Sequence, residues 1–329
     1  MTTLTLRSMR ISSSRHPMIQ NKFLQSPLPF SSISLLIQKR HASTTTTSTI
    51  TTPSPPRNKL DGPISTLPAS LNTPERQPGQ SFFPSYAFSL GKSYLTFYKR
   101  GVKAIYTNFM ACRPIQAKLD TKYNGSLEKA IDAGFLDRSS FQLLTRSWFD
   151  VKRIPIFALV FLICGEFTPL VVVAVTSVVP YTCRIPKQIE NDRKTLEKRR
   201  AISFRNLTAE LPENNAGVDQ LARMQLLHIS WSLGLSSSAW DWLGGQLPGL
   251  PNSILRRKVR RRVQYLEWDD KLIKKYGGVD GMSVEEVRMA LVERGVDVLE
   301  NSVSELRSAL KAWLRAREEV SILRLLLTR

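Results

Sequence analysis

The sequence predicts an all-α fold in which one transmembrane helix precedes a helical C-terminal domain. Three observations support this prediction. One long apolar segment occupies residues 154–181, helical periodicity fills most of residues 184–329, and no run of alternating apolar residues is long enough for a strand. The roughly 145 residues after the apolar segment suffice for a single helical core.

The apolar segment spans 28 residues and holds one charge, Glu166, close to its middle. As a helix it would extend roughly 42 Å, which exceeds the ~30 Å hydrocarbon core of a bilayer. We therefore expect one membrane crossing; a buried hairpin broken between Gly165 and Pro169 is the alternative. Glu166, beside backbone loosened by Pro169, is a candidate intramembrane ion-coupling group. The structural alternative is a protonated carboxyl bonded to Thr168 or to a partner helix.

The first 60 residues have the composition of an organelle-targeting leader. They contain eight Lys or Arg residues, no Asp or Glu, and many Ser and Thr residues. Residues 33–37 are too short for the apolar core of a secretory signal. The sequence KRHAS at 39–43 resembles a processing site, so we expect a transit peptide over residues 1–42. Together with a single span, this leader indicates the mitochondrial inner membrane, whereas a disordered basic tail is the alternative.

Two segments lie between the leader and the apolar segment. Residues 43–80 are rich in Ser, Thr and Pro without apolar periodicity, so we expect a disordered linker. Residues 81–153 are expected to form amphipathic helices before the membrane. Within them, aromatic and apolar residues recur at roughly helical spacing between cations: Tyr94, Tyr98, Ile105 and Phe109, with Lys99, Arg100 and Lys103. This pattern is typical of a helix in the lipid headgroup region and, equally, of a core helix in a small bundle.

The helix that enters the membrane is expected to begin at a cap formed by Ser139 or Ser140. Within it Arg146, Asp150 and Arg153 are spaced four and three residues apart, so they share one face and can pair. Seven Lys or Arg residues follow the apolar segment in the next 20 positions, against four in the 20 before it. This asymmetry favours a C-terminal domain on the matrix side.

Residues 254–266 carry the strongest interaction signal. Leu255, Val259 and Val263 recur every four residues, which places them on a narrow stripe that faces a core. Around the stripe lie six cations in seven positions: Arg256, Arg257, Lys258, Arg260, Arg261 and Arg262. Like charges at this density repel one another, so we expect an anion-binding face; a merely solvated surface is the alternative. RNA phosphates and anionic lipids such as cardiolipin both suit such a face.

The C-terminal region contains a weak internal repeat, residues 283–291 and 302–310. Each copy begins with Ser followed three residues later by Glu, which predicts a capping box at Ser283 and at Ser302. Trp313 is expected to close the core behind the second helix. This layout resembles that of nucleic-acid-binding SAP modules. The glycine-rich residues 277–281 lack the flanking features of a phosphate loop, so we expect a turn.

The net charge and the few cysteines and histidines limit the functions that the chain can have. The net charge of +20 favours anionic partners, either RNA or acidic lipid. The three cysteines show no paired spacing, and outside the leader region the only histidine is His228, to which we assign no role. No nucleophile–base pair, metal cluster or nucleotide loop appears. We therefore expect no enzyme activity, no metal and no cofactor.

The order of these motifs resembles the LETM family, the leucine-zipper/EF-hand-containing transmembrane proteins of the mitochondrial inner membrane. The likeness runs from Tyr98 to Leu314 and rests on the following residues: Tyr98-Lys99-Arg100-Gly101-Val102-Lys103, Asn108, Leu144-Thr145-Arg146, Asp150, Arg153-Ile154-Pro155, Glu166, Pro169, Leu250-Pro251, Leu255, Asp269-Asp270, Gly277-Gly278-Val279, Glu285-Glu286, Arg294-Gly295 and Trp313-Leu314. The resemblance implies a matrix-facing ribosome-binding domain with a 14-3-3-like fold. A short form without EF-hands is expected, because Asp269-Asp270 lacks the spacing of a calcium loop.

Two functions follow from this resemblance and from the residues. The favoured one is binding of mitochondrial ribosomes, through ribosomal RNA or protein, in support of translation and membrane protein biogenesis. The alternative is K⁺/H⁺ or Ca²⁺/H⁺ exchange, with Glu166 as the ion-coupling group. One span cannot enclose a pathway, so exchange would require a homo-oligomer. The expected partners are thus the ribosome, the inner membrane with its anionic lipid, and a second copy of the chain.

Overall fold

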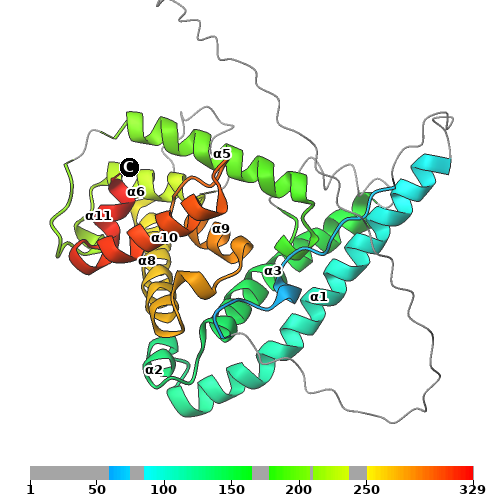
Figure 1. The fold of residues 1–329 in the computed structure, drawn as a ribbon, viewed down its shortest axis with the longest axis horizontal. Helices are drawn as coiled ribbons and strands as arrows, with labels where there is room; N and C mark the ends of the chain where they lie inside the picture. The colour runs from blue at the N-terminus through cyan, green and yellow to red at the C-terminus, as the bar shows by residue number, and fades with distance from the viewer. Residues whose placement is uncertain (1–58, 75–84, 165–177, 208–209, 237–249, 329) are drawn as a thin grey trace, which may run out of the picture. The chain divides into compact units, whose positions relative to one another are not determined.

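The computed structural model describes residues 59–74, 85–164, 178–207, 210–236 and 250–328, which all belong to one compact unit over residues 54–329. Every regular element in these ranges is an α-helix or a 3-10 turn, and they contain no strand (Figure 1). The prediction of an all-α fold is confirmed for this part of the chain. The 14-3-3-like topology implied by the resemblance stays a prediction.

Residues 59–74 lie inside the segment expected to be a disordered linker, but they are ordered. Leu60 is buried in the core of the C-terminal domain, and its carbonyl oxygen accepts a 2.8 Å hydrogen bond from Arg138 Nη1. The carbonyl of Lys59 accepts the Ser139 amide at 3.0 Å. The prediction of disorder is wrong for these residues. The Leu60 side chain and two backbone carbonyls contact residues far along the chain, and such contacts cannot be read from composition.

Two long helices form the pre-membrane region, α1 (Ser85–Tyr123) and α3 (Arg138–Cys164), joined by the short α2 (Leu127–Asp132). They pack along each other in opposite directions (Figure 1). α1 also packs against the 3-10 turn η4 (Tyr181–Cys183), and this contact requires Gly101, because a Cβ there would lie 2.6 Å from Cys183 Sγ. Side-chain size therefore limits how closely α1 approaches the chain that follows the apolar segment.

Only part of the aromatic and apolar stripe predicted for α1 is buried. Phe97, Ile105 and Asn108 are buried on the face toward α3, η4 and the 3-10 turn η1 (Ile64–Thr66), whereas Phe109 is exposed. The core-helix interpretation therefore holds for one face of α1. The opposite face leaves apolar side chains in contact with solvent.

The first turn of α3 differs from the prediction in its cap and its ion pairs. Asp137 Oδ1 accepts the amide of Ser140 at 2.7 Å, so Asp137 is the cap and the two serines lie within the first turn. Arg146 pairs with Glu286 of a distant helix, and Asp150 accepts the Tyr181 amide at 2.7 Å. Local spacing suggested an Arg146–Asp150 pair, but each side chain instead contacts a residue that is distant in the sequence.

Within the predicted transmembrane helix over residues 154–181, residues 165–177 lie outside the described residues, and they include Glu166 and Pro169. Within the described ranges, no helix combines the length and the apolarity needed to span a bilayer. The contacts of the described residues are at odds with a single crossing, because Asp150 before the segment accepts the amide of Tyr181 at its end and Arg146 pairs with Glu286 beyond it, whereas one crossing would separate these residues by the thickness of the bilayer.

Beyond residue 184 the described residues form six α-helices and two 3-10 turns: α5 (Pro186–Arg205), η5 (Val218–Gln220), α6 (Arg223–Ser232), α8 (Asn252–Lys275), η6 (Val279–Gly281), α9 (Val284–Glu293), α10 (Val303–Glu319) and α11 (Ile322–Leu327). α8 contacts α2, α3, α6, α11 and η5, so it joins the pre-membrane helices to the C-terminal domain. The predicted turn at residues 277–281 is confirmed, and Gly277 and Gly278 there have φ values of 118° and 73°.

The internal repeat forms α9 and α10, but only the second copy has its predicted capping box. Ser302 Oγ accepts the Glu305 amide at 3.3 Å, and Glu305 Oε2 accepts the Ser302 amide at 2.7 Å. At the first copy, Ser283 does precede the helix, yet Glu286 faces the core and Asp61 accepts the Ser283 amide at 3.1 Å instead. The capping box is absent because Glu286 neutralises buried arginines.

Candidate functional site

The apolar stripe of α8 lies where the periodicity placed it. Leu255, Val259, Val263 and Leu266 are all buried in the core of the C-terminal domain. Because this side of α8 packs inward, the cations between the stripe residues are directed to the flanks and to the outer side of the helix. The stripe thus determines which of the six cations are accessible.

Three of the six cations make contacts within the chain. Lys258 Nζ donates to the carbonyl of Leu235, just beyond α6, at 2.8 Å. Arg260 Nη2 donates to both carboxylate oxygens of Asp219, at 2.6 and 2.8 Å. The guanidinium of Arg262 lies 5.4 Å from the centre of the Tyr265 ring. These contacts occupy part of the predicted anion-binding face.

Arg257 and Arg261 are exposed, one helical turn apart, and form no ion pair with any residue that the structure describes. Arg256 is half-buried, and its Nε has no hydrogen-bond partner within the described ranges. We refer to Arg257 and Arg261 as the arginine row. The row presents two guanidinium groups on the outer side of a helix whose other side is anchored in the core, which is a geometry suited to phosphate oxygens.

A second cluster of charged residues lies inside the fold, and the sequence analysis missed it. Its six members come from three helices and are at most 9% exposed. They are Arg138 and Arg146 of α3, Asp269 and Asp270 of α8, and Glu286 and Arg294 at α9. We call this set the buried ion cluster. With three cations and three anions, it has no net charge.

Asp269 and Glu286 are the central acids of the buried ion cluster. Asp269 accepts from Arg138 Nε at 2.8 Å with one oxygen and from Arg294 Nη2 at 2.8 Å with the other. Glu286 accepts from Arg138 Nη1 at 3.0 Å and from both terminal nitrogens of Arg146, at 2.6 and 2.9 Å. Each acid therefore links two arginines, and together they tie α3 to both α8 and α9.

Neutral side chains complete the cluster. Gln142 Nε2 donates to Asp269 at 2.9 Å, and Trp313 Nε1 donates to Asp270 at 3.2 Å. Asp270 also accepts from Arg294 Nη2 at 2.5 Å. The buried Trp313 belongs to the core as the sequence predicted, and its indole N–H extends the hydrogen-bond network to α10.

The protonation states follow from the balance between burial and charge. Burial by itself would raise the pKa of Asp269, but Arg138 and Arg294 outweigh this effect and hold that pKa at about 2. Burial opposes ionisation of Glu286 as well, and Arg146 and Arg138 lower its pKa in the same way. Both acids are therefore ionised at neutral pH, and the cluster acts as a structural ion network.

One sequence signal could have revealed the cluster. Asp269 and Asp270 follow Leu266 by three and four residues, so they continue the apolar stripe of α8 into the core. A charged residue at a core-facing position requires a buried partner of opposite charge. The identity of the partners, however, could not be read from the chain, because Arg138 lies 131 residues from Asp269.

His228 is a packed core residue. Its Nδ1 lies 2.7 Å from Ser203 Oγ, and its ring meets the edge of Phe204 at a centroid distance of 4.4 Å. Burial lowers the pKa of His228, which favours the neutral ring at neutral pH. This environment is that of a structural histidine.

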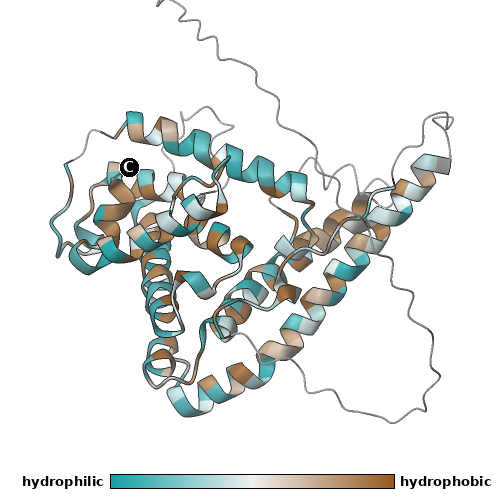
Figure 2. Ribbon diagram, viewed as in Figure 1, coloured by the Kyte–Doolittle hydropathy of each residue, from teal (hydrophilic) through white to brown (hydrophobic). Residues whose placement is uncertain are grey.

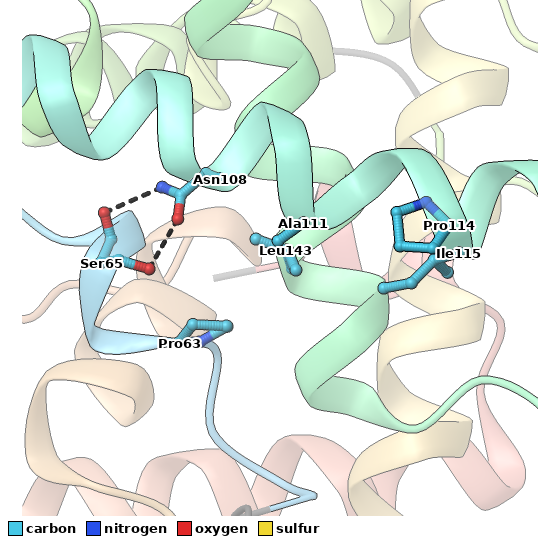
Figure 3. Close-up of a pocket in the computed structure, with 7 residues that line it drawn as sticks. All are labelled: Pro63, Ser65, Asn108, Ala111, Pro114, Ile115 and Leu143. Atoms are coloured by element: carbon cyan, nitrogen blue, oxygen red, sulfur yellow. Dashed lines mark hydrogen bonds between the residues drawn. The ribbon is translucent and has the colours of Figure 1, made fainter.

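Figure 3 shows a pocket of about 400 Å³ between α1, α3 and the segment that carries η1. Its only polar lining side chains satisfy each other: Ser65 Oγ donates to Asn108 Oδ1 at 2.6 Å, and Asn108 Nδ2 donates to the carbonyl of Ser65 at 2.9 Å. The remaining lining residues are Pro63, Ala111, Pro114, Ile115 and Leu143. The lining provides no titratable group, and the hydroxyl of Ser65 donates to an amide oxygen and not to a base, so we assign this pocket no chemistry.

Residues 184–329 match the family model described as LETM1-like, RBD. No curated protein and no solved structure matches the chain. The matched region contains the arginine row and four members of the buried ion cluster, whereas Arg138 and Arg146 precede it.

Proposed function

We propose that this chain, a LETM-family protein in which residues 184–329 form a LETM1-like ribosome-binding domain, binds mitochondrial ribosomes at the matrix face of the inner membrane. Binding there would support translation and the insertion of newly made membrane proteins. The family match carries the proposal. The arginine row supplies a contact of the appropriate chemistry.

The arginine row supports the proposal through its position. Arg257 and Arg261 extend outward from a helix whose inner side is held by four buried apolar residues, so their backbone positions are defined before any partner binds. Ribosomal RNA presents phosphates at high density. Binding to them releases condensed counterions, which gives a favourable, salt-sensitive and sequence-independent contribution to affinity.

The location follows from the leader, the apolar segment and the family, whose members reside in the mitochondrial inner membrane. The buried ion cluster adds a distance constraint. Arg146, which pairs with Glu286 of the domain, precedes the apolar segment at residue 154 by only eight positions. Because this pair joins residues before and after the apolar segment, both ends of residues 154–181 must lie on one side of any bilayer that the segment enters, and the domain is then held close to the membrane, where a nascent membrane protein leaves the ribosome. Exchange of cations at Glu166 stays a prediction from the sequence.

The test is a charge reversal in the full chain. We expect Arg257→Glu with Arg261→Glu to weaken co-sedimentation with purified mitochondrial ribosomes about tenfold or more at near-physiological salt, and to reduce the salt dependence of what remains. The full chain is required, because the segment 184–329 alone lacks Arg138 and Arg146. Lys118→Glu with Lys122→Glu, at the exposed end of α1, is the matched control for net charge.

Two results would contradict this assignment. Unchanged ribosome binding by the double variant would reject the arginine row as the contact. Retained ribosome binding with lost binding to cardiolipin vesicles would show that the row serves the membrane.

A further inference from the structure

α1 has apolar side chains on two opposite sides. One side is buried against α3, η1 and η4 through Phe97, Ile105 and their neighbours. The other side is open to solvent, although a surface helix of a soluble protein is normally polar there. Figure 2 shows hydrophobic residues alternating with hydrophilic ones along the whole of α1.

The exposed apolar residues of α1 lie in a line along one face of the helix. Between 37% and 77% of each side chain is accessible, and successive members are spaced seven, seven, four, three and one residues apart, which places them on one face of the helix. They are Phe88, Leu95, Val102, Tyr106, Phe109 and Met110. We call them the outer face of α1. It extends roughly 33 Å along the helix axis.

The charges of α1 have one sign along almost its entire length. Six cations occur between residues 85 and 119, and this range contains no Asp or Glu. They are Lys92, Lys99, Arg100, Lys103, Arg113 and Lys118. Of these, Lys92, Lys99, Lys103 and Arg113 lie three or four residues from outer-face residues, so long aliphatic stems accompany the apolar line.

We propose that the outer face of α1 lies on a bilayer surface that carries anionic lipid. Aromatic and aliphatic side chains at the acyl boundary, flanked by lysines at the depth of the headgroup phosphates, are the arrangement of an interfacial amphipathic helix. A protein partner of this length would need a matching acidic face, whereas an anionic membrane supplies negative charge everywhere along the line.

The packing of α1 on α3 places further exposed apolar residues beside this surface. Cys112 Sγ donates to the carbonyl of Leu143, and Tyr98 packs in one cluster with Phe157, so the N-terminal half of α1 runs beside the C-terminal half of α3. That end of α3, residues 154–164, is itself the first part of the apolar segment. Exposed Leu159, Leu162 and Ile163 of α3 add to the apolar surface there. The inference does not depend on ribosome binding.

Photo-crosslinking tests the inference in the full chain reconstituted into nanodiscs. Benzoylphenylalanine replaces Leu95 or Tyr106 on the outer face, or Glu318 at the exposed end of α10 as the control. We expect lipid adducts, detected by mass spectrometry, at the two outer-face positions and not at residue 318. The yield should be several-fold higher with cardiolipin in phosphatidylcholine than with phosphatidylcholine alone.

A charge variant separates the role of the lysines from that of the apolar line. Lys92→Glu, Lys99→Glu and Lys103→Glu together should remove the gain that cardiolipin produces at residue 106, while helix content by circular dichroism stays unchanged. Adducts with a second copy of the chain in place of lipid, or an equal lipid yield at residue 318, would overturn the proposal.

Discussion

The two halves of α8 hold their charges in opposite environments. In the first half, Arg257 and Arg261 face solvent without an acid opposite them among the described residues. In the second half, Asp269 and Asp270 are buried, and arginines from α3 and α9 surround them. Both halves have their apolar stripe in the core. The difference lies in the neighbours, because α3 and the end of α9 supply cations to the second half alone.

This comparison shows why charge density along a sequence does not report function by itself. A charged group inside a protein is stable only when paired and hydrogen-bonded, and removal of one partner leaves an uncompensated charge. A charged group on the surface can be changed with little effect on folding. The exposed arginines in the first half of α8 can therefore be changed with little effect on folding, whereas the second half holds the domain on the pre-membrane helices.

The largest expected effect comes from Asp269→Ala. This change leaves Arg138 and Arg294 short of their shared acid, and we expect it to lower the free energy of unfolding by about 3–5 kcal/mol. Thermal and denaturant unfolding of the purified full chain measure it. Arg257→Ala with Arg261→Ala is the matched change in the other half of α8, expected to shift stability by no more than about 0.5 kcal/mol. Equal losses of unfolding free energy in the two variants would show that the two halves of α8 do not differ in this way.

A smaller effect is expected from Glu286→Gln, and its size should depend on α3. In the full chain the change removes the charge that both Arg138 and Arg146 contact, at a cost of roughly 3 kcal/mol. In a chain cut to residues 184–329 those two arginines are missing, so the same substitution should cost about 0.5 kcal/mol or less. Denaturant unfolding of the full and the cut chain, each with Glu286 and with Gln in its place, measures the free energy of unfolding in all four proteins and gives the coupling between the substitution and α3. A cost that is the same in both backgrounds would show that the cluster does not couple α3 to the domain.

The smallest expected effect is a dependence of stability on acid. The pKa of Asp269 falls from 3.8 to about 2 on folding, and the pKa of Glu286 is lowered as well. A lowered folded pKa contributes stability that is complete above the unfolded pKa and is lost as pH falls toward the folded pKa. We therefore expect roughly 2 kcal/mol from Asp269 to disappear between about pH 4 and pH 2. Asp269→Asn should flatten this slope, and an unchanged slope would assign the acid sensitivity to other groups.

Much of the local structure could be predicted from the sequence. Periodicity alone located the buried stripe of α8, and the Ser302–Glu305 pair located the start of α10 with its cap. Trp313 was assigned to the core because it follows that helix at the correct spacing. These features depend on residues within about one or two helical turns of each other, where backbone geometry dictates which side chains meet.

The failures share a different cause. Glu286 had the spacing of a capping box, Arg146 had the spacing of a local pair, and residues 59–74 had the composition of a linker. In each case a partner from a remote part of the chain replaced the local interaction. Glu286 pairs with Arg138 and Arg146 instead of capping its own helix. Leu60 packs in the core, and its carbonyl oxygen accepts a hydrogen bond from Arg138 of α3. Rules based on sequence spacing cannot decide between a local and a remote partner, because burial changes the energy of an ionic contact far more than spacing does.

By itself, the sequence determined the helical class, the placement of the α8 stripe and the concentration of positive charge beside it. The tertiary structure decided which charges are available. It directed three cations of α8 to contacts within the chain, left Arg257 and Arg261 exposed, and buried Asp269 against arginines from α3 and α9. The physical reason is that helix formation depends on neighbours along the chain, whereas the accessibility of a charge depends on which other helices fold against it.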